Sequence, residues 1–496
     1  MNGTKFPDEV LSRDELLKLV RMQAATIKRL EKQVEELFAK LKEKNPTERL
    51  DESYSQKAEE QRKKAQQDSK SGTKTGKGKK PKNKRKGRIT TAEKIKKAQR
   101  VQAVYPDDIA PSDCTLSHTR VVWRLEGGQA VLVAYEIYRY RNQFGRIEGV
   151  LGRSEFGIEI VLALSYQVHC LGLSIDKACK VLSFFQQLDL KKSQADRLLN
   201  QLAKAWESEF EHLCTILANS AVVYCDETSW SINSVWAFLN EHVTVAFYGV
   251  HKDGQTLAAI IDKEVFKGTL VSDDAAVYQG FDVAQKCWAH LIRKAIKLTL
   301  TSPDDPRFRQ LADGLLQIYR DAKRISNDGR MLAATKQSKV ADLDDRVLEL
   351  CWDRWGDEDR DCEGDEDSYR KLCNELMGLM LGEELFVFVY REGVDGNNNA
   401  SERELRDDAT ARRTGRTSKT PAGAKRRSII SSVLRSIGKQ VEVFTLASVI
   451  AEVKQWMIRG KSCFEKLASK AANKTTPGIL DRLVLEADKP AISPSG

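Results

Sequence analysis

One short stretch, Ala221 to Trp230, places two acidic side chains directly after a run of residues that favours a buried strand. The run ends at Tyr224, and β-branched and aromatic residues are typical of strands. Asp226 and Glu227 follow it. A carboxylate at the end of a buried strand is costly unless a positive partner meets it. The stretch therefore predicts a strand that presents Asp226 to a metal ion, an arginine or backbone donors, while Glu227 points to the opposite face.

The residues after this stretch predict further strands and helices of one α/β sheet. Strands are expected at 221–225, 234–240, 243–250, 268–272 and 281–286, and helices at 256–266 and 288–300. Three meandering strands, a helix, and then more strand and helix is the element order of a ribonuclease H-like sheet, in which ligands lie at strand ends. The run 268–272 ends at Asp273, a second acid at a strand end.

The first hundred residues have a different composition. A heptad pattern of apolar residues between Leu16 and Leu41 predicts a short coiled coil that joins two copies of the chain. Between Lys70 and Arg88 there are ten Lys or Arg and no acid, which cannot form a core and predicts a disordered linker that contacts phosphates. The formal net charge of +10 is concentrated near the two ends of the chain, as suits a polyanionic partner.

These patterns divide the 496 residues into seven segments. They are a coiled coil at 1–50, a basic linker at 51–105, a small β unit at 106–150, a helical region with a helix-turn-helix candidate at 151–215, a catalytic α/β domain at 216–300 and 391–440, a helical insertion at 301–390, and C-terminal helices with a frayed tail at 441–496. No run of 18 apolar residues occurs, so no membrane span is expected, and the ten cysteines are expected to be reduced thiols in the cytoplasm.

A third acid, Glu402, opens a predicted helix far downstream of the two strand-end acids. Cleavage of a phosphodiester can use two divalent ions roughly 4 Å apart, and Mg²⁺ prefers carboxylate oxygens. Asp226, Asp273 and Glu402 are therefore candidate ligands of two Mg²⁺ or Mn²⁺ ions. The alternative is that a strand-end Asp serves as a helix cap or turn residue, which is the commoner role.

Four motifs in a fixed order carry a resemblance to a known family. They are Tyr224-Cys225-Asp226-Glu227-Thr228, Val271-Ser272-Asp273 to Tyr278, Cys287-Trp288-Ala289-His290, and Asn398-Asn399-Ala400-Ser401-Glu402-Arg403-Glu404-Leu405-Arg406. Together they resemble the insertion-sequence 66 family of bacterial transposases. The resemblance implies a metal-dependent DDE enzyme with a ribonuclease H-like core interrupted by a helical insertion. It also implies that Asp226, Asp273 and Glu402 are the three metal ligands.

The chain departs from the family pattern at several positions. Asp274-Ala275 stands where Gly-Tyr is usual, so Asp274 is an alternative ligand to Asp273, and Glu404 is an alternative to Glu402. The zinc ribbon of many members needs paired cysteines, whereas this region has only Cys114, and no zinc site is expected there. The Cys287 and His290 pair matches the family's Cys-x-x-His motif. Two ligands do not complete a zinc site, and we expect a packing or orienting role.

The function implied is that of a DNA transposase that cleaves the 3′ ends of its element and joins them to target DNA. Its partners would be double-stranded DNA, a second copy of the chain and accessory proteins of the same element, in the cytoplasm at the nucleoid. The residues expected to contact nucleic acid are Arg403, Arg406, Trp288, Lys84, Arg85 and Lys86. The alternatives are an inactive DNA-binding protein derived from a transposase and a nuclease of the same fold.

Overall fold

A computed structural model describes residues 90–355, 364–473 and 478–487. The predicted coiled coil and the basic residues Lys84, Arg85 and Lys86 lie outside the described residues. Within the described residues the chain is a mixed α/β protein with two sheets. None of its described helices combines the length and the apolar character that crossing a membrane requires.

The small β unit contains four strands and is larger than the sequence indicated. Its elements are α3 (Thr91–Lys96), β1 (Arg100–Val104), β2 (Thr115–Glu126), β3 (Gln129–Tyr140) and β4 (Gln143–Phe144). The prediction that the linker extends to residue 105 was wrong, because β1 pairs in parallel with β3 from Arg100↔Val133 to Val104↔Ile137. The long hairpin β2–β3 offers β1 an edge on which to pair.

Four helices and a π-helical turn follow, as the apolar periodicity predicted. They are α4 (Ile158–Ser165), the turn η2 (Tyr166–Cys170), α5 (Ile175–Gln186), α6 (Lys192–Ala205) and α7 (Glu207–Ala218). The Ser174 hydroxyl accepts a hydrogen bond from the Lys177 backbone N–H at 3.2 Å and so caps the N-terminus of α5. DNA binding by the α5–α6 pair stays a prediction.

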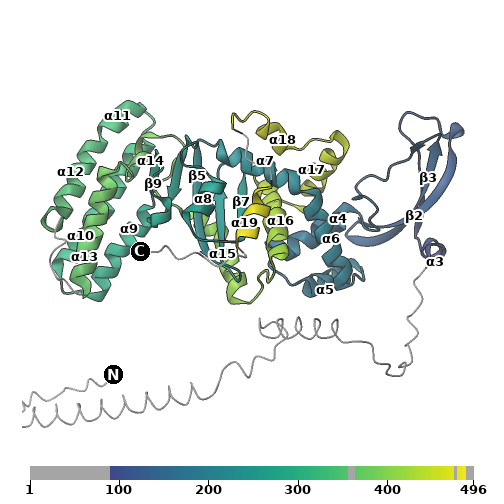
Figure 1. Cartoon of the computed structure of the whole chain (residues 1–496), viewed down its shortest axis with the longest axis horizontal. Helices are drawn as coiled ribbons and strands as arrows, with labels where there is room; N and C mark the ends of the chain where they lie inside the picture. The colour runs from purple at the N-terminus through teal and green to yellow at the C-terminus, as the bar shows by residue number, and fades with distance from the viewer. Residues whose placement is uncertain (1–89, 356–363, 474–477, 488–496) are drawn as a thin grey trace, which may run out of the picture. The chain divides into compact units, whose positions relative to one another are not determined.

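The central sheet has five strands in the order β7-β6-β5-β8-β9. The strands are β5 (Val222–Ser229), β6 (Ser234–Leu239), β7 (Thr244–Val250), β8 (Thr269–Ser272) and β9 (Ala284–Lys286), and α8 (Gly254–Ile260) lies between β7 and β8 in the chain. Strands β5, β6 and β7 form an antiparallel meander, whereas β8 and β9 run parallel to β5. Figure 1 shows α8 beside this sheet.

Strand β5 is longer than the predicted run 221–225. It stays paired with β6 as far as Ser229↔Ser234, while its pairing with β8 ends at Tyr224↔Val271. Pairing with β6 therefore extends β5 beyond Asp226 and Glu227, and Asp226 lies inside the strand rather than at its end. It lies beyond the point where the parallel neighbour stops.

Strand β7 is at the edge of the sheet, and the helix α16 (Pro421–Gln440) covers it (Figure 1). An edge strand has a row of unpaired backbone groups. Three serines of α16 satisfy them: the hydroxyls of Ser428, Ser432 and Ser436 accept hydrogen bonds from the backbone N–H groups of Tyr248, Ala246 and Thr244 at 3.0, 2.9 and 3.0 Å. Their spacing of four residues places them on one face of the helix.

The approach of α16 to β7 requires a glycine. Gly249 has φ +78°, and a Cβ built on it would meet the Cβ of Ala424 at 2.9 Å. It lies where the register between β6 and β7 shifts, which is a usual place for a glycine in a bulge.

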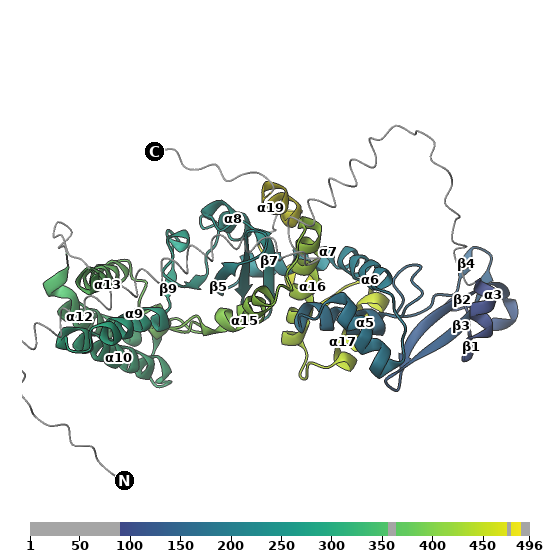
Figure 2. The same ribbon diagram turned by 90° about the horizontal axis from the view of Figure 1, so that it is seen from below.

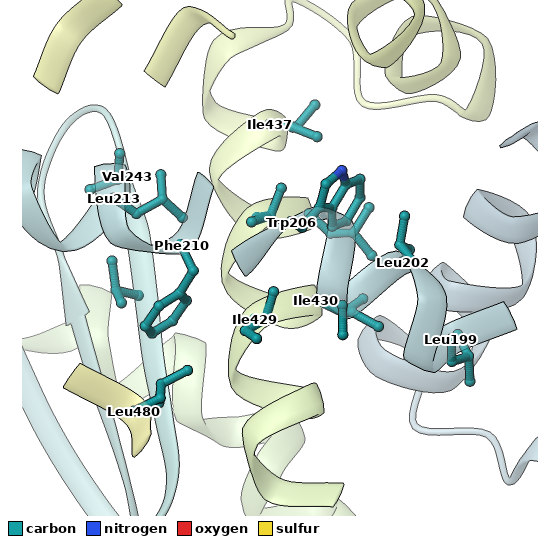
Figure 3. Close-up of a cluster of buried hydrophobic side chains, with 14 of the residues drawn as sticks. Leu199, Leu202, Trp206, Phe210, Leu213, Val243, Ile429, Ile430, Ile437 and Leu480 are labelled. Atoms are coloured by element: carbon teal, nitrogen blue, oxygen red, sulfur yellow. The ribbon is translucent and has the colours of Figure 1, made fainter. Parts of the chain in front are cut away.

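Another face of α16 packs on apolar residues of α6 and α7. Figure 3 shows Ile429, Ile430 and Ile437 of α16 beside Trp206 and Phe210, which belong to the same core cluster. All five side chains are buried. The helix therefore joins the sheet to the preceding helical region.

The predicted insertion is helical. It follows α9 (Trp288–Thr301) and consists of α10 (Pro306–Asn327), α11 (Ala333–Ser338), α12 (Val340–Cys351), α13 (Gly364–Leu381) and α14 (Val387–Tyr390). Figure 2 shows α9, α10, α12 and α13 gathered together, and their apolar faces form a core cluster of their own. This cluster includes Val271 of β8, so the insertion packs directly against the sheet.

The chain then returns to the sheet through α15 (Asn399–Arg413) and α16, followed by α17 (Leu446–Arg459), α18 (Cys463–Ala468) and α19 (Ile479–Ala487). The prediction of a frayed tail from residue 477 was wrong for the first part of that tail. Helix α19 contacts β7, α8 and α16, and it buries Ile479, Leu480 and Leu483. These apolar residues recur at helical spacing, which accounts for the helix.

The serine contacts on β7 give a stability prediction. Ser432→Ala removes the hydroxyl that accepts a hydrogen bond from the buried Ala246 N–H at 2.9 Å, and we expect the free energy of unfolding to fall by about 1–3 kcal/mol. Chemical denaturation measures this. The matched control is Ser338→Ala, an exposed serine on α11, which we expect to change stability by less than about 0.5 kcal/mol. Equal effects of the two changes would contradict the interpretation.

Candidate active site

Asp226 lies in β5, and Asp273 is the residue directly after the neighbouring strand β8. The parallel register of β5 and β8 runs from Val222↔Thr269 to Tyr224↔Val271, and continuing it by two residues aligns Asp226 with Asp273. The next strand continues the row, because β9 pairs Lys286 with Ser272 and the backbone N–H of Cys287 donates to the carbonyl of Ser272 at 2.9 Å. The edge of the sheet formed by the carboxyl ends of β8 and β9 thus carries Asp273 and Cys287, with Asp226 of β5 beside them.

Asn398 attaches the start of α15 to this edge. Its side-chain amide is fully buried and donates from Nδ2 to the carbonyl of Cys225 at 2.7 Å. Its backbone N–H donates to the Cys287 Sγ at 3.1 Å, and its carbonyl accepts from the N–H of Glu402 at 3.2 Å. The first turn of α15, which carries Glu402, is thereby fixed against both β5 and the start of α9.

The charges of these acids interact. Burial, together with the neighbouring carboxylates of Glu227, Asp273 and Glu402, raises the pKa of Asp226 to about 7, against a hydrogen bond from the Glu227 backbone N–H that lowers it. The structure therefore brings the three predicted ligands within electrostatic reach of one another. A group of mutually repelling carboxylates is stabilised by a cation.

Glu227 points away from Asp226, as the strand alternation predicted. Its side chain is nearly fully buried, accepts a hydrogen bond from the Tyr278 hydroxyl and pairs with Lys252. The Glu227 carboxylate has its own partners and belongs to the packing on the other face of β5.

The two alternative ligands also have partners elsewhere. Asp274 pairs with Lys294, which also contacts Glu375 at 2.8 Å. Although burial opposes it, hydrogen bonds from Glu375 and Lys294 lower the pKa of Asp274 to about 2, while burial and the bond with Asp274 raise the pKa of Glu375 to about 7. Glu404 faces Arg435, with Oε2 3.7 Å from the guanidinium, in a cavity of about 470 Å³.

Asp226 and Asp273 differ from these acids. In the part of the chain that the structure describes, neither forms an ion pair, whereas Glu227, Asp274 and Glu404 each face a lysine or arginine. Glu402 does have a cationic partner, although an exposed one: its Oε1 accepts a hydrogen bond from Arg293 at 2.7 Å and lies 3.6 Å from the His290 Nε2. Oxygen donors whose charges are not neutralised are the ligands that Mg²⁺ or Mn²⁺ requires, so the three residues fit a divalent cation.

Of the residues expected to contact nucleic acid, Trp288 was predicted wrongly. Its side chain is fully buried, its Nε1 donates to the carbonyl of Leu385 at 2.7 Å, and its ring stacks on Tyr319 with centroids 5.5 Å apart. It belongs to the core cluster that α9 shares with the insertion and is not available to a base. Arg403 and Arg406 are exposed on α15, as phosphate contacts must be, and their role stays a prediction.

The sequence reasoning missed the role of Asn398. Asn398 holds the N-cap position of α15, but it forms no side-chain cap bond and uses its amide on β5 instead. The signal available was its position four residues before Glu402. The reasoning also did not identify Lys294 with Glu375, or Lys252, as partners of the neighbouring acids.

The site and the sheet define an α/β protein that clusters carboxylates at a sheet edge beside exposed arginines. The family model described as Transposase IS66 family matches residues 153–426, a range that contains Asp226, Asp273, Cys287, His290 and Glu402. The match covers more than half of the chain, and the chain belongs to this transposase family, which confirms the resemblance found in the sequence motifs. Comparison with curated proteins gave no match.

Replacing Asn398 tests how the site is held together. Asn398→Ala leaves the carbonyl of Cys225 without its side-chain donor, and we expect the free energy of unfolding to fall by about 1–3 kcal/mol. Chemical denaturation is the measurement. Asn399→Ala, at the exposed neighbouring position, is the control and should be close to neutral. A neutral Asn398→Ala would show that the amide does not fix α15.

The raised pKa of Asp226 predicts how stability depends on pH. Because the folded-state pKa of about 7 exceeds the unfolded value of about 3.9, stability in the presence of a chelator falls as pH rises from about 4 to about 7. Asp226→Asn removes this ionisation. The stability of the variant relative to the parent protein should therefore rise by about 4 kcal/mol between about pH 4 and the folded pKa.

Urea denaturation at several pH values, with chelator and then with Mg²⁺, measures this difference. Added Mg²⁺ should stabilise the parent protein more than Asp226→Asn. Asp313→Asn, at an exposed position on α10, is the control and should show no growing difference. A pH-independent difference for Asp226→Asn would contradict the pKa assignment.

Proposed function

We propose that this chain is an active DDE transposase with a ribonuclease H-like core, and that Asp226, Asp273 and Glu402 hold two Mg²⁺ or Mn²⁺ ions. The observation that carries the proposal is the placement of these three carboxylates at one sheet edge, where the charges of Asp273 and Glu402 raise the pKa of Asp226. The strand order β7-β6-β5-β8-β9, with β5, β6 and β7 antiparallel and β8 and β9 parallel to β5, supports the fold assignment.

The metal ions, when bound, would activate the attacking oxygen and stabilise the leaving oxygen of a phosphodiester. The chain supplies the rest of the arrangement. Asp226 is fixed by the pairing of β5 with β6, Asp273 directly follows the paired strand β8, and Glu402 is fixed through Asn398 and Arg293. Exposed Arg403 and Arg406 lie on the same helix as Glu402 and would contact DNA phosphates.

The substrate would be double-stranded DNA at the ends of an insertion element. Water would attack first and free a 3′-hydroxyl, and that hydroxyl would then attack target DNA. Each step exchanges one phosphodiester bond for another bond to the same phosphorus, so no covalent protein intermediate is needed. The N-terminal coiled coil would pair two copies, so that two ends can be joined together in the cytoplasm at the nucleoid, with accessory proteins of the same element.

Replacing the three acids tests the proposal. Asp226→Asn, Asp273→Asn and Glu402→Gln should each lower metal-dependent cleavage of end-containing DNA by at least about 100-fold and leave binding to the ends intact, because the ions supply several kcal/mol of transition-state stabilisation. A nicking assay and a gel-shift assay measure the two properties.

Glu404→Gln is the matched control, since Glu404 is on the same helix and faces Arg435 instead. Normal cleavage by any of the three variants would remove that residue from the metal site. A strand-transfer assay with precut ends separates a transposase from a nuclease of the same fold. End binding without metal-dependent nicking in the parent protein would indicate an inactive DNA-binding derivative.

A further inference from the structure

Cys287, His290 and Glu402 bring three different kinds of metal ligand together. Cys287 is the N-cap of α9, His290 lies in the first turn of that helix, and Glu402 lies in the first turn of α15. The Cys287 Sγ, a ring nitrogen of His290 and a carboxylate oxygen of Glu402 all lie within 4.8 Å of one another. The sequence alone indicated only the first two, and the fold supplies the third from beyond the helical insertion.

We propose that these three residues form a second metal site, which takes a transition-metal ion of the Zn²⁺ class and shares Glu402 with the carboxylate pair. Thiolate and imidazole ligands select Zn²⁺ or Co²⁺ over Mg²⁺, which prefers oxygen. Three protein ligands leave the fourth position of a tetrahedral ion to water or to a substrate oxygen. The site does not depend on the proposed cleavage activity.

Burial raises the pKa of the Cys287 thiol, and backbone N–H donors partly oppose that rise. The backbone N–H of Asn398 donates to the Sγ at 3.1 Å, and the sulfur lies at the N-terminus of the 14-residue helix α9. Both place partial positive charge at the sulfur. When the ion binds, the thiol proton passes to solvent and the sulfur forms the bond to the metal.

The other two ligands are accessible from solvent. The side chains of His290 and Glu402 are 28% and 27% exposed, so an ion can reach the site from solvent. The buried His290 Nδ1 has no hydrogen-bond partner among the described residues. Arg293, which donates to the Glu402 Oε1, is a cation that competes with a metal ion for this carboxylate.

Co²⁺ is the probe, because Zn²⁺ has no visible spectrum. Titration of the full-length protein with Co²⁺ should give a near-ultraviolet thiolate-to-cobalt charge-transfer band, which added Zn²⁺ removes. Cys287→Ser should abolish the band. His290→Ala and Glu402→Gln should weaken Co²⁺ binding by about tenfold or more. Cys463→Ser, at a partly buried thiol on α18, is the control and should keep the band.

Arg293→Ala provides an independent arm, since removing the competing cation should tighten Co²⁺ binding severalfold. Lys297→Ala, at an exposed position on the same helix, should have a smaller effect. Thermal unfolding of each variant without metal shows whether the fold is kept. If Cys287→Ser fails to fold, His290→Ala still tests the site, because the His290 side chain is partly exposed.

The proposal is overturned if Co²⁺ gives no thiolate band, if the band survives Cys287→Ser, or if folded His290→Ala binds Co²⁺ as tightly as the parent protein. Asp226→Asn separates the two proposals, because it should lose nicking and keep the cobalt band. Loss of nicking in that variant therefore bears on the cleavage site alone, and loss of the band in Cys287→Ser bears on the second site alone.

Discussion

The arrangement of the acidic site depends on one buried amide, Asn398. Its side chain bonds to β5, its backbone N–H to the Cys287 sulfur at the start of α9, and its carbonyl to the backbone of Glu402. The helical insertion separates α9 from α15 in the chain, and closing so long a loop costs conformational entropy. The residue specifies one position for the returning helix, because a shift of α15 breaks its bonds to β5, to Cys287 and to Glu402 at once.

The distribution of cations separates acids that look alike in the sequence. Lys252 meets Glu227, Lys294 meets Asp274, and Arg435 meets Glu404. Each of these carboxylates is neutralised by the fold. Asp226 and Asp273 have no such ion pair within the described residues, and the pKa of Asp226 is raised to about 7 by burial and by its acidic neighbours. The fold therefore accepts an electrostatic cost at this edge, which is typical of a site built for a charged ligand.

Local patterns predicted the strands that carry Asp226 and Asp273, because a short apolar run reports burial directly. The position of Glu402 came from the family motifs, since no local pattern connects residues on either side of an insertion. Asn398 and Trp288 show the limit of such reasoning. An Asn before a helix can cap it or bridge to a strand, and a Trp beside a candidate site can be exposed or buried. The partners that decide between these outcomes, Cys225 for the amide and Tyr319 for the ring, are distant in sequence.

Glu402 lies at the border of two chemically different environments. On one side are the carboxylates of Asp226 and Asp273, which suit an oxygen-preferring cation, and on the other are the sulfur and imidazole of Cys287 and His290, which suit a softer one. A carboxylate engaged with one ion is a weaker ligand for the other, so binding at the two proposed sites would be coupled. Coupling through a shared ligand is reciprocal: the factor by which Zn²⁺ lowers the affinity for Mg²⁺ equals the factor by which Mg²⁺ lowers the affinity for Zn²⁺. The first turn of α15 would then determine which kind of ion the sheet edge holds.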